Sequence, residues 1–317
     1  MRGHLKPVVT LLAITPFLTE LLSNNLPPSV FFKPLNYFFL ATIGYGFPVL
    51  LLREWACTKR MGLAGMLCLG FAYGIVNEGI LAKTYFLSTH VPIGTFDNYG
   101  RCWGISVPWA ITITVWHAFH SLCYPILMTY YFFPDHREER WLSRRGALWL
   151  FAVTALLSAA IFFTHSPGHP AGSVPHFAFL MGCIGLLAWG ATWISEWARI
   201  CDMNSPRWKL ILRGAGAPLL LLLLPVLMSG AKVSPPALEG YFALALFLIF
   251  RWLWKHREAS VAGCVLFAAG DDLMLALLAL LGAVHARSLE KICADLILIA
   301  VFAVFASRVR IPQLVND

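Results

Sequence analysis

Apolar stretches close to the length that crosses a lipid bilayer recur along the whole chain, and they restrict the fold more than any other feature. A transmembrane helix needs about 20 mostly apolar residues. Hydrophobic residues make up 59% of the 317 residues and charged residues only 13%, which is too apolar for an ordinary soluble domain. We therefore predict an all-α, polytopic integral membrane protein in which residues 1–317 form a single transmembrane domain of about ten helices. The expected spans are Val8–Leu22, Tyr37–Leu52, Gly62–Ala82, Val107–Phe133, Ala147–Phe163, Phe177–Ile194, Ala215–Met228, Ala237–Phe250, Val261–Val284 and Ile292–Ala306.

The distribution of Lys and Arg predicts the orientation of these helices, because cytoplasmic loops carry the excess of basic residues. With a cytoplasmic N-terminus, ten spans place 18 of the 24 basic residues on the cytoplasmic side and 6 on the outer side. An even number of spans then puts the C-terminus in the cytoplasm as well. In this interpretation the net charge of +8 reflects membrane topology rather than a nucleic-acid-binding surface.

The sequence contains no motif for a cofactor. The eight cysteines lack the short paired spacing of a zinc site or a disulfide framework. A phosphate-binding glycine loop and a haem-attachment sequence are also missing. We therefore expect no cofactor and no bound metal. The expected partners are membrane lipids and a small-molecule or ion substrate, and no nucleic acid.

Four ionisable residues lie in the middle of two apolar stretches. Asp271 and Asp272 are adjacent in the ninth stretch, and His117 and His120 lie in the fourth. Ionisable groups in hydrocarbon are costly unless they face other protein or a wet cavity, so they are candidate functional residues. Adjacent helical residues point about 100° apart, so only one of the two aspartates can face a given cavity squarely.

The helical rise of about 1.5 Å per residue gives the expected depth of each polar group. His117 and Asp271 fall near the midplane of a hydrocarbon core about 30 Å thick. Glu20 and Glu78 fall in its outer third. If the helices adjoin, these groups would form a polar path from the outer face to the centre.

Helical periodicity predicts where Glu78 points. Gly70, Gly74 and Glu78 share one face at i, i+4 and i+8, and glycine lets helices pack closely. Glu78 is therefore expected to face a neighbouring helix rather than lipid. His117 and Ser121 lie on a polar stripe of the fourth stretch, which we expect to face other protein as well.

Four short runs resemble the signature stretches of a group of uncharacterised polytopic bacterial membrane proteins. Members of this group carry two acidic residues before the glycine of the third-span motif, where this chain has Asn77 and Glu78. The resemblance implies a bacterial inner-membrane (plasma-membrane) setting and points to Glu20, Glu78, Arg101 and His117, but it implies no reaction. The runs are Thr15–Pro34, Ala72–Gly79, Asn98–Gly104 and Trp116–Ile126.

A comparison with the CAAX-protease-like intramembrane glutamate proteases matches poorly. Those enzymes use an acidic pair followed by Arg at helical spacing, and then histidines on later helices. Here Asn77 replaces one acid, Lys83 falls off the face of Glu78, and the two intramembrane histidines share one helix. A Glu with a His can still act as a general base that positions water, so an enzyme stays among the alternatives.

The first hypothesis is a secondary transporter or permease for a small molecule or ion, with proton coupling as one mode. Asp271 or Asp272 would form a midplane site with His117, and Glu78 and Glu20 would line the outer approach. A cavity that reaches both Asp271 and His117 would favour this reading. We also expect one aspartate to be hydrogen-bonded to a polar group of another helix.

Two further hypotheses stay open. The second is an intramembrane hydrolase or transferase acting on a lipid or peptide at the outer leaflet. In it Glu78 would be the base, His117 the acid or a metal ligand, and Arg101 an anion contact. The third is an assembly factor without chemistry, in which buried carboxyls and neutral imidazoles such as His120 hold helices together by hydrogen bonds.

Overall fold

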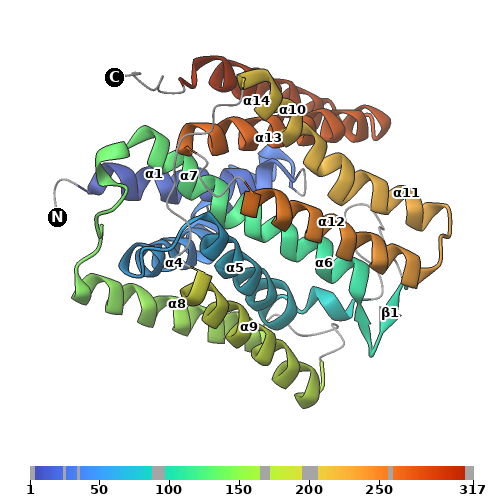
Figure 1. Ribbon diagram of the computed structural model, residues 1–317, viewed down its shortest axis with the longest axis horizontal. Helices are drawn as coiled ribbons and strands as arrows, with labels where there is room; N and C mark the ends of the chain where they lie inside the picture. Colours follow the sequence, from blue (N-terminus) through green and yellow to red (C-terminus); the bar gives the residue numbers. More distant parts are fainter. Residues whose placement is uncertain are drawn as a thin grey trace.

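The fold is helical throughout the part of the chain that the computed structural model describes, which comprises residues 4–23, 26–33, 36–87, 96, 98–164, 172–194, 206–255 and 260–310. A two-stranded antiparallel ribbon, β1 (Arg101–Cys102) and β2 (Ile105–Ser106), is the exception among these residues. The helices form one bundle, with α8 and α9 along one edge and α10, α13 and α14 at the opposite edge (Figure 1).

The α-helices are α1 (Leu5–Pro16), α2 (Pro28–Phe31), α3 (Asn36–Ala41), α4 (Phe47–Thr58), α5 (Leu63–Gly74), α6 (Val107–Trp116), α7 (Tyr124–Phe132), α8 (Arg144–Thr164), α9 (Val174–Ile194), α10 (Arg207–Pro218), α11 (Leu224–Gly230), α12 (Pro235–Lys255), α13 (Val261–His285) and α14 (Leu289–Arg308). Short 3₁₀ turns are η4 (Thr84–Phe86) and η6 (Pro134–His136). Five π-helical segments continue α-helices: η1 (Phe17–Leu21), η2 (Thr42–Gly46), η3 (Ile75–Leu81), η5 (His117–Cys123) and η8 (Leu219–Leu223).

Each of the ten predicted stretches lies in a helix. Six continuous helices of the described chain are long and apolar enough to cross a membrane: Leu63–Leu81, Val107–Phe132, Arg144–Thr164, Val174–Ile194, Arg207–Gly230 and Val261–His285. A shorter apolar helix covers Pro235–Ile249. An all-α membrane protein is thus supported, and the predicted count of about ten spans exceeds the six that length and composition identify.

Glycines bring two pairs of helices into close contact. On α5, a Cβ at Gly70 would lie 2.7 Å from the Ala118 Cα, and one at Gly74 would lie 3.0 Å from the Thr114 Cα. The glycine face that precedes Glu78 therefore packs on another helix, as its periodicity predicts.

The contact of α10 with α13 is closer still. A Cβ at Gly214 would lie 1.9 Å from the Phe267 carbonyl oxygen, and one at Gly270 would lie 2.1 Å from the Ile211 carbonyl oxygen. The two backbones touch at this crossing, which fixes the depth of Asp271, the residue after Gly270.

Proline spacing explains three of the π-helical segments. Pro48, Pro125 and Pro225 each lie two residues after the last residue of η2, η5 and η8. Proline lacks an N–H, and its ring collides with the carbonyl four residues earlier in an α-helix. A wider π turn moves that carbonyl aside, and it leaves carbonyls for side chains to bind. The Tyr73 hydroxyl, for example, donates to the Gly44 carbonyl within η2 at 3.5 Å.

Candidate functional site

The π-helical segments carry the polar residues of the first half of the chain. Glu20 lies in η1, Glu78 in η3, and His117 and His120 in η5. All four side chains are buried. Since π turns often occur at functional sites and re-aim the side chains they carry, this shared backbone feature marks the region as the candidate site.

The first group is the Glu78 cluster, made of Glu78, His117, Ser121, Thr84 and Asn77. Glu78 Oε1 lies 2.9 Å from His117 Nε2, and Asn77 Nδ2 donates to the same oxygen at 3.3 Å. Thr84 Oγ1 donates to Glu78 Oε2 at 2.5 Å. On the other side of the imidazole, His117 Nδ1 lies 2.8 Å from Ser121 Oγ. A carboxylate, an imidazole and a hydroxyl are thus joined in one chain of hydrogen bonds.

Aromatic rings enclose the imidazole of His117. The Tyr45 ring stacks on it with centroids 5.9 Å apart, and the Tyr73 ring meets it edge-on at 5.8 Å. A side-chain hydrogen bond joins Tyr45 to Glu20. Glu20 therefore reaches the Glu78 cluster through Tyr45, and the predicted role of these residues as a substrate or proton site stays a prediction.

The second group is the Asp271 cluster, made of Asp271, Asp272, His120 and Tyr124. The Tyr124 hydroxyl donates a short hydrogen bond to Asp271 Oδ2. His120 Nε2 lies 3.7 Å from Asp271 Oδ2 and 3.6 Å from Asp272 Oδ1. Asp272 is fully buried, and within the described ranges neither of its carboxylate oxygens nor His120 Nε2 has a hydrogen-bond partner. A buried acid pair with unsatisfied oxygens is costly, which singles this cluster out.

The expected hydrogen bond from another helix to one aspartate is present, but the histidine beside the pair differs from the prediction. His120, rather than His117, lies next to the aspartates. In an α-helix, residues i and i+3 point about 60° apart, and the sequence predicts His117, rather than His120, at the aspartate site. The wider turn of η5 separates them, and each histidine joins its own cluster.

A cavity of about 780 Å³ reaches the Asp271 cluster. His120, Tyr124 and Asp271 line it, together with many apolar side chains of α6, α7, α10–η8, α12 and α13. The exposed Arg213 also lies in its wall. His117 and Glu78 are not among the lining residues, so this cavity does not join Asp271 to His117 as the transporter hypothesis predicts.

Arg101 is engaged with the backbone of its own loop region. Its guanidinium donates to the carbonyls of Leu87 at 2.5 Å, Phe86 at 3.1 Å and Gly104 at 2.5 Å. The bonds to Phe86 and Leu87 tie the β1–β2 ribbon to the end of η4, and the bond to Gly104 lies within the ribbon turn. The structure thus shows Arg101 as a link between loops, and its predicted role as an anion contact stays untested.

Sequence reasoning missed a buried ion pair at one end of the bundle. Arg53 is fully buried, and its Nη1 lies 2.7 Å from Glu54 Oε1. The guanidinium packs 3.6 Å from the centre of the Trp141 ring and donates to the carbonyls of His136 and Arg137. Arg53 and Glu54 are adjacent opposite charges directly after the second apolar stretch, and from the sequence Arg53 counts only as a topology marker.

Metal-ligand spacing occurs in one group of the described residues, formed by His4, His136 and Glu139. This group belongs to neither cluster.

One of the three comparisons with known proteins finds a match, and it is to a protein family. No curated protein and no solved structure matches the chain. The model of a family described as an uncharacterized membrane protein family matches residues 9–315. This match agrees with the resemblance seen in the sequence, and the long apolar helices agree with a multi-pass membrane protein. The chain therefore belongs to this family of uncharacterised membrane proteins.

Proposed function

We propose that this protein is a proton-coupled secondary transporter for small amphipathic molecules that carry a positive charge. The observation that carries the proposal is the cavity of about 780 Å³ with Asp271, His120 and Tyr124 in its wall. Its volume falls in the range of pockets that hold small molecules. Asp271 in the cavity wall is expected near the membrane midplane, which is the depth at which carriers hold their substrates and protons.

The apolar walls of the cavity support an amphipathic substrate. Leu220, Leu244 and Leu248 line the cavity and are at least half exposed. In a membrane these side chains face lipid, so the cavity opens sideways toward the bilayer. A substrate that partitions into the membrane could enter by this route.

The Asp271 cluster supports both the charge preference and the proton coupling. Asp271 places a carboxyl in the wall of an apolar cavity, Asp272 is fully buried next to it in the chain, and His120 Nε2 lies within 3.7 Å of both. A cationic substrate would give Asp271 a charged partner in addition to its hydrogen bond from Tyr124. Loss of the substrate would favour uptake of a proton, because an uncompensated charge in a buried site is costly.

We further propose that the chain spans a bacterial inner membrane ten times, with both termini in the cytoplasm. The four predicted spans outside the six long apolar helices are helical in Leu5–Leu21, Asn36–Thr58, Pro235–Lys255 and Leu289–Arg308. The placement of 18 of 24 basic residues on one side supports the count.

Two ions of the same shape and opposite charge test the proposal, tetraphenylphosphonium and tetraphenylborate. Titration calorimetry on the purified protein should detect binding of the cation, with affinity reduced at least tenfold in Asp271→Asn. Proteoliposomes with an acidic lumen should accumulate the cation in exchange for protons, and Asp271→Asn should abolish this uptake. Arg144→Ala, an exposed change at the start of α8, is the matched control and should behave as the wild type.

The proposal is wrong if folded wild-type protein binds neither ion. It is also wrong if both ions bind equally and Asp271→Asn changes neither affinity. Cation binding without uptake along a proton gradient would remove the transport part of the proposal.

A hydrolase or transferase is a second candidate, favoured by the Glu78–His117–Ser121 chain. Its order of carboxylate, imidazole and hydroxyl is the arrangement that activates a serine nucleophile. A fluorophosphonate probe should then label Ser121 in the wild type, and Ser121→Ala and His117→Asn should both lose the label. Ser121 is fully buried, so a catalytic serine here requires an opening that admits substrate and probe alike. Absence of labelling both in lipid and in detergent would remove this candidate.

A further inference from the structure

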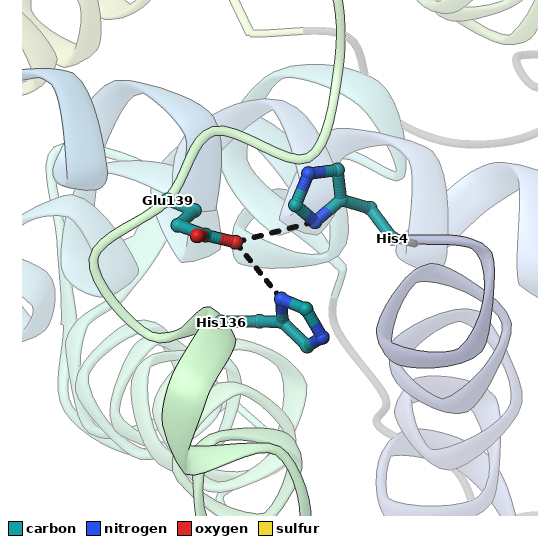
Figure 2. A group of neighbouring side chains, drawn as sticks. All are labelled: His4, His136 and Glu139. Carbon is teal, nitrogen blue, oxygen red and sulfur yellow. Dashed lines mark hydrogen bonds and ion pairs between the residues drawn. The ribbon is translucent and has the colours of Figure 1, made fainter. Parts of the chain in front are cut away.

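Three potential metal ligands meet at the end of the bundle where α1 begins (Figure 2). His4 is the residue before α1, His136 ends η6, and Glu139 follows in the loop before α8. His136 Nδ1 lies 2.8 Å from Glu139 Oε2, and His4 Nδ1 lies 3.6 Å from the same oxygen. The two imidazoles meet edge-on with centroids 5.1 Å apart.

The spacing of the three atoms suits a transition-metal ion. One ligand atom from each residue lies within 4.8 Å of the others. Metal–nitrogen bonds of about 2.0–2.1 Å in a tetrahedral site bring neighbouring ligand atoms to a little over 3 Å from each other. Small side-chain movements would therefore close the present arrangement around an ion.

The His4 donor atom is buried although part of its side chain is exposed. His4 Nδ1 is inaccessible to solvent and has no hydrogen-bond partner among the residues described. A buried ring nitrogen without a partner calls for an explanation. It points into the same space as His136 Nδ1 and Glu139 Oε2, where a metal ion would satisfy it.

The loop that presents two of the ligands is held in place without a metal. Arg53 Nη2 donates to the carbonyls of His136 at 3.1 Å and Arg137 at 3.0 Å. Trp141 Nε1 donates to the His136 carbonyl at 2.8 Å. Because these bonds already fix the backbone of the loop, the loop loses less conformational entropy when an ion binds.

We propose that His4, His136 and Glu139 bind one Zn²⁺-class ion, with water completing the coordination. Two imidazoles and one carboxylate form a donor set that such ions accept, and an open position makes the ion exchangeable. Bound metal would tie the start of α1 to the loop between α7 and α8. This inference is independent of the proposed transport, since none of the three residues lines the cavity.

Direct metal binding tests the site, using full-length protein whose affinity tag contains no histidine. Competition between the purified protein and a chromophoric chelator should show one equivalent of Zn²⁺ bound, undisturbed by millimolar Mg²⁺. His4→Ala, His136→Ala and Glu139→Gln should each weaken binding at least tenfold. His285→Ala, an exposed histidine at the end of α13, is the control and should keep wild-type affinity.

A second readout separates loss of the ligand from loss of the fold. Zn²⁺ should raise the unfolding temperature of the wild type and of His285→Ala, but not that of the three ligand variants. Size-exclusion profiles establish that each variant is folded. The site does not exist if folded wild type binds no Zn²⁺, or if the three variants bind it as tightly as the wild type.

Discussion

Glu78 Oε1 and His117 Nε2 lie 2.9 Å apart and join two π-helical segments, η3 and η5. Both side chains are buried, so each takes the place of water as the hydrogen-bond partner of the other. Thr84 holds the second carboxylate oxygen of Glu78, and Ser121 holds the second nitrogen of His117. The contact is therefore the centre of a connected polar network rather than an isolated pair.

Glu78→Ala should destabilise the protein more than Glu78→Gln. Alanine removes the acceptors of both the Thr84 hydroxyl and the His117 ring, and each buried group that loses its partner costs about 1–3 kcal/mol. Glutamine keeps one side-chain oxygen and the shape of the residue. Thermal unfolding in detergent should rank the variants as wild type, then Gln, then Ala. Equal unfolding temperatures for Ala and the wild type would contradict the network.

Gly214→Ala should disrupt the packing of α10 on α13, because the added Cβ would lie 1.9 Å from a backbone oxygen that cannot move aside alone. Gly216→Ala on the same helix is the matched control, since a Cβ there meets nothing within 4 Å. We expect a loss of about 2 kcal/mol or more for the first variant, and little change for the second. The measurement is the yield of monodisperse protein and its unfolding temperature. Equal values for the two variants would show that α10 and α13 pack less closely than the structure indicates.

Removing one partner of the buried Arg53–Glu54 pair should cost about 3–5 kcal/mol, because the remaining charge stays buried without an opposite charge in direct contact. The double variant Arg53→Met/Glu54→Leu should lose less than the sum of the two single variants. Reversible unfolding in mixed micelles gives the three free energies. Additive losses would mean that the two charges are stabilised separately, Arg53 by the Trp141 ring and the loop carbonyls, and Glu54 by the backbone N–H groups of Trp141 and Leu142.

The helices could be predicted from the sequence because apolar composition alone specifies them in a membrane protein. The contact of Glu78 with another helix followed from the glycine spacing of α5, and Gly70 and Gly74 do pack on Ala118 and Thr114. The separation of His117 from His120 could not be obtained in this way, since an α-helical wheel puts them on neighbouring faces.

Proline positions indicate where some of the π-helical segments lie, which a helical wheel does not show. Pro125 lies two residues after η5, and the same offset recurs at Pro48 and Pro225. The loop between α7 and α8 is a different case. Its attachment to Arg53 joins residues that are more than 80 positions apart, and no local pattern encodes such a contact.

The ten-span topology predicts that a reporter fused after Asp317 is cytoplasmic and that one inserted between Ser166 and Ala171 is outside. Both positions lie outside the described residues, so only the count of spans decides the outcome. Ten spans separate the two termini, and five separate the start of the chain from the internal position. Alkaline phosphatase and green fluorescent protein fusions report the two sides. Finding both reporters on one side would contradict the ten-span proposal.

Asp272→Asn should leave the protein as stable as the wild type or make it more stable, although the residue is fully buried. Its carboxylate oxygens have no hydrogen-bond partner within the described chain, so an ionised side chain there is destabilising. Asparagine keeps the shape and removes the charge. A functional site retains such a costly group because the activity requires it. We therefore expect Asp272→Asn to keep or raise the unfolding temperature while it lowers proton-driven uptake of tetraphenylphosphonium.

Ser260→Ala, which removes the hydroxyl that caps the start of α13, is the contrasting variant and should lower stability by about 1 kcal/mol without changing uptake. A clear drop in the unfolding temperature of Asp272→Asn would show that the aspartate stabilises the helix bundle, and the case for a functional acid pair would then rest on Asp271 alone.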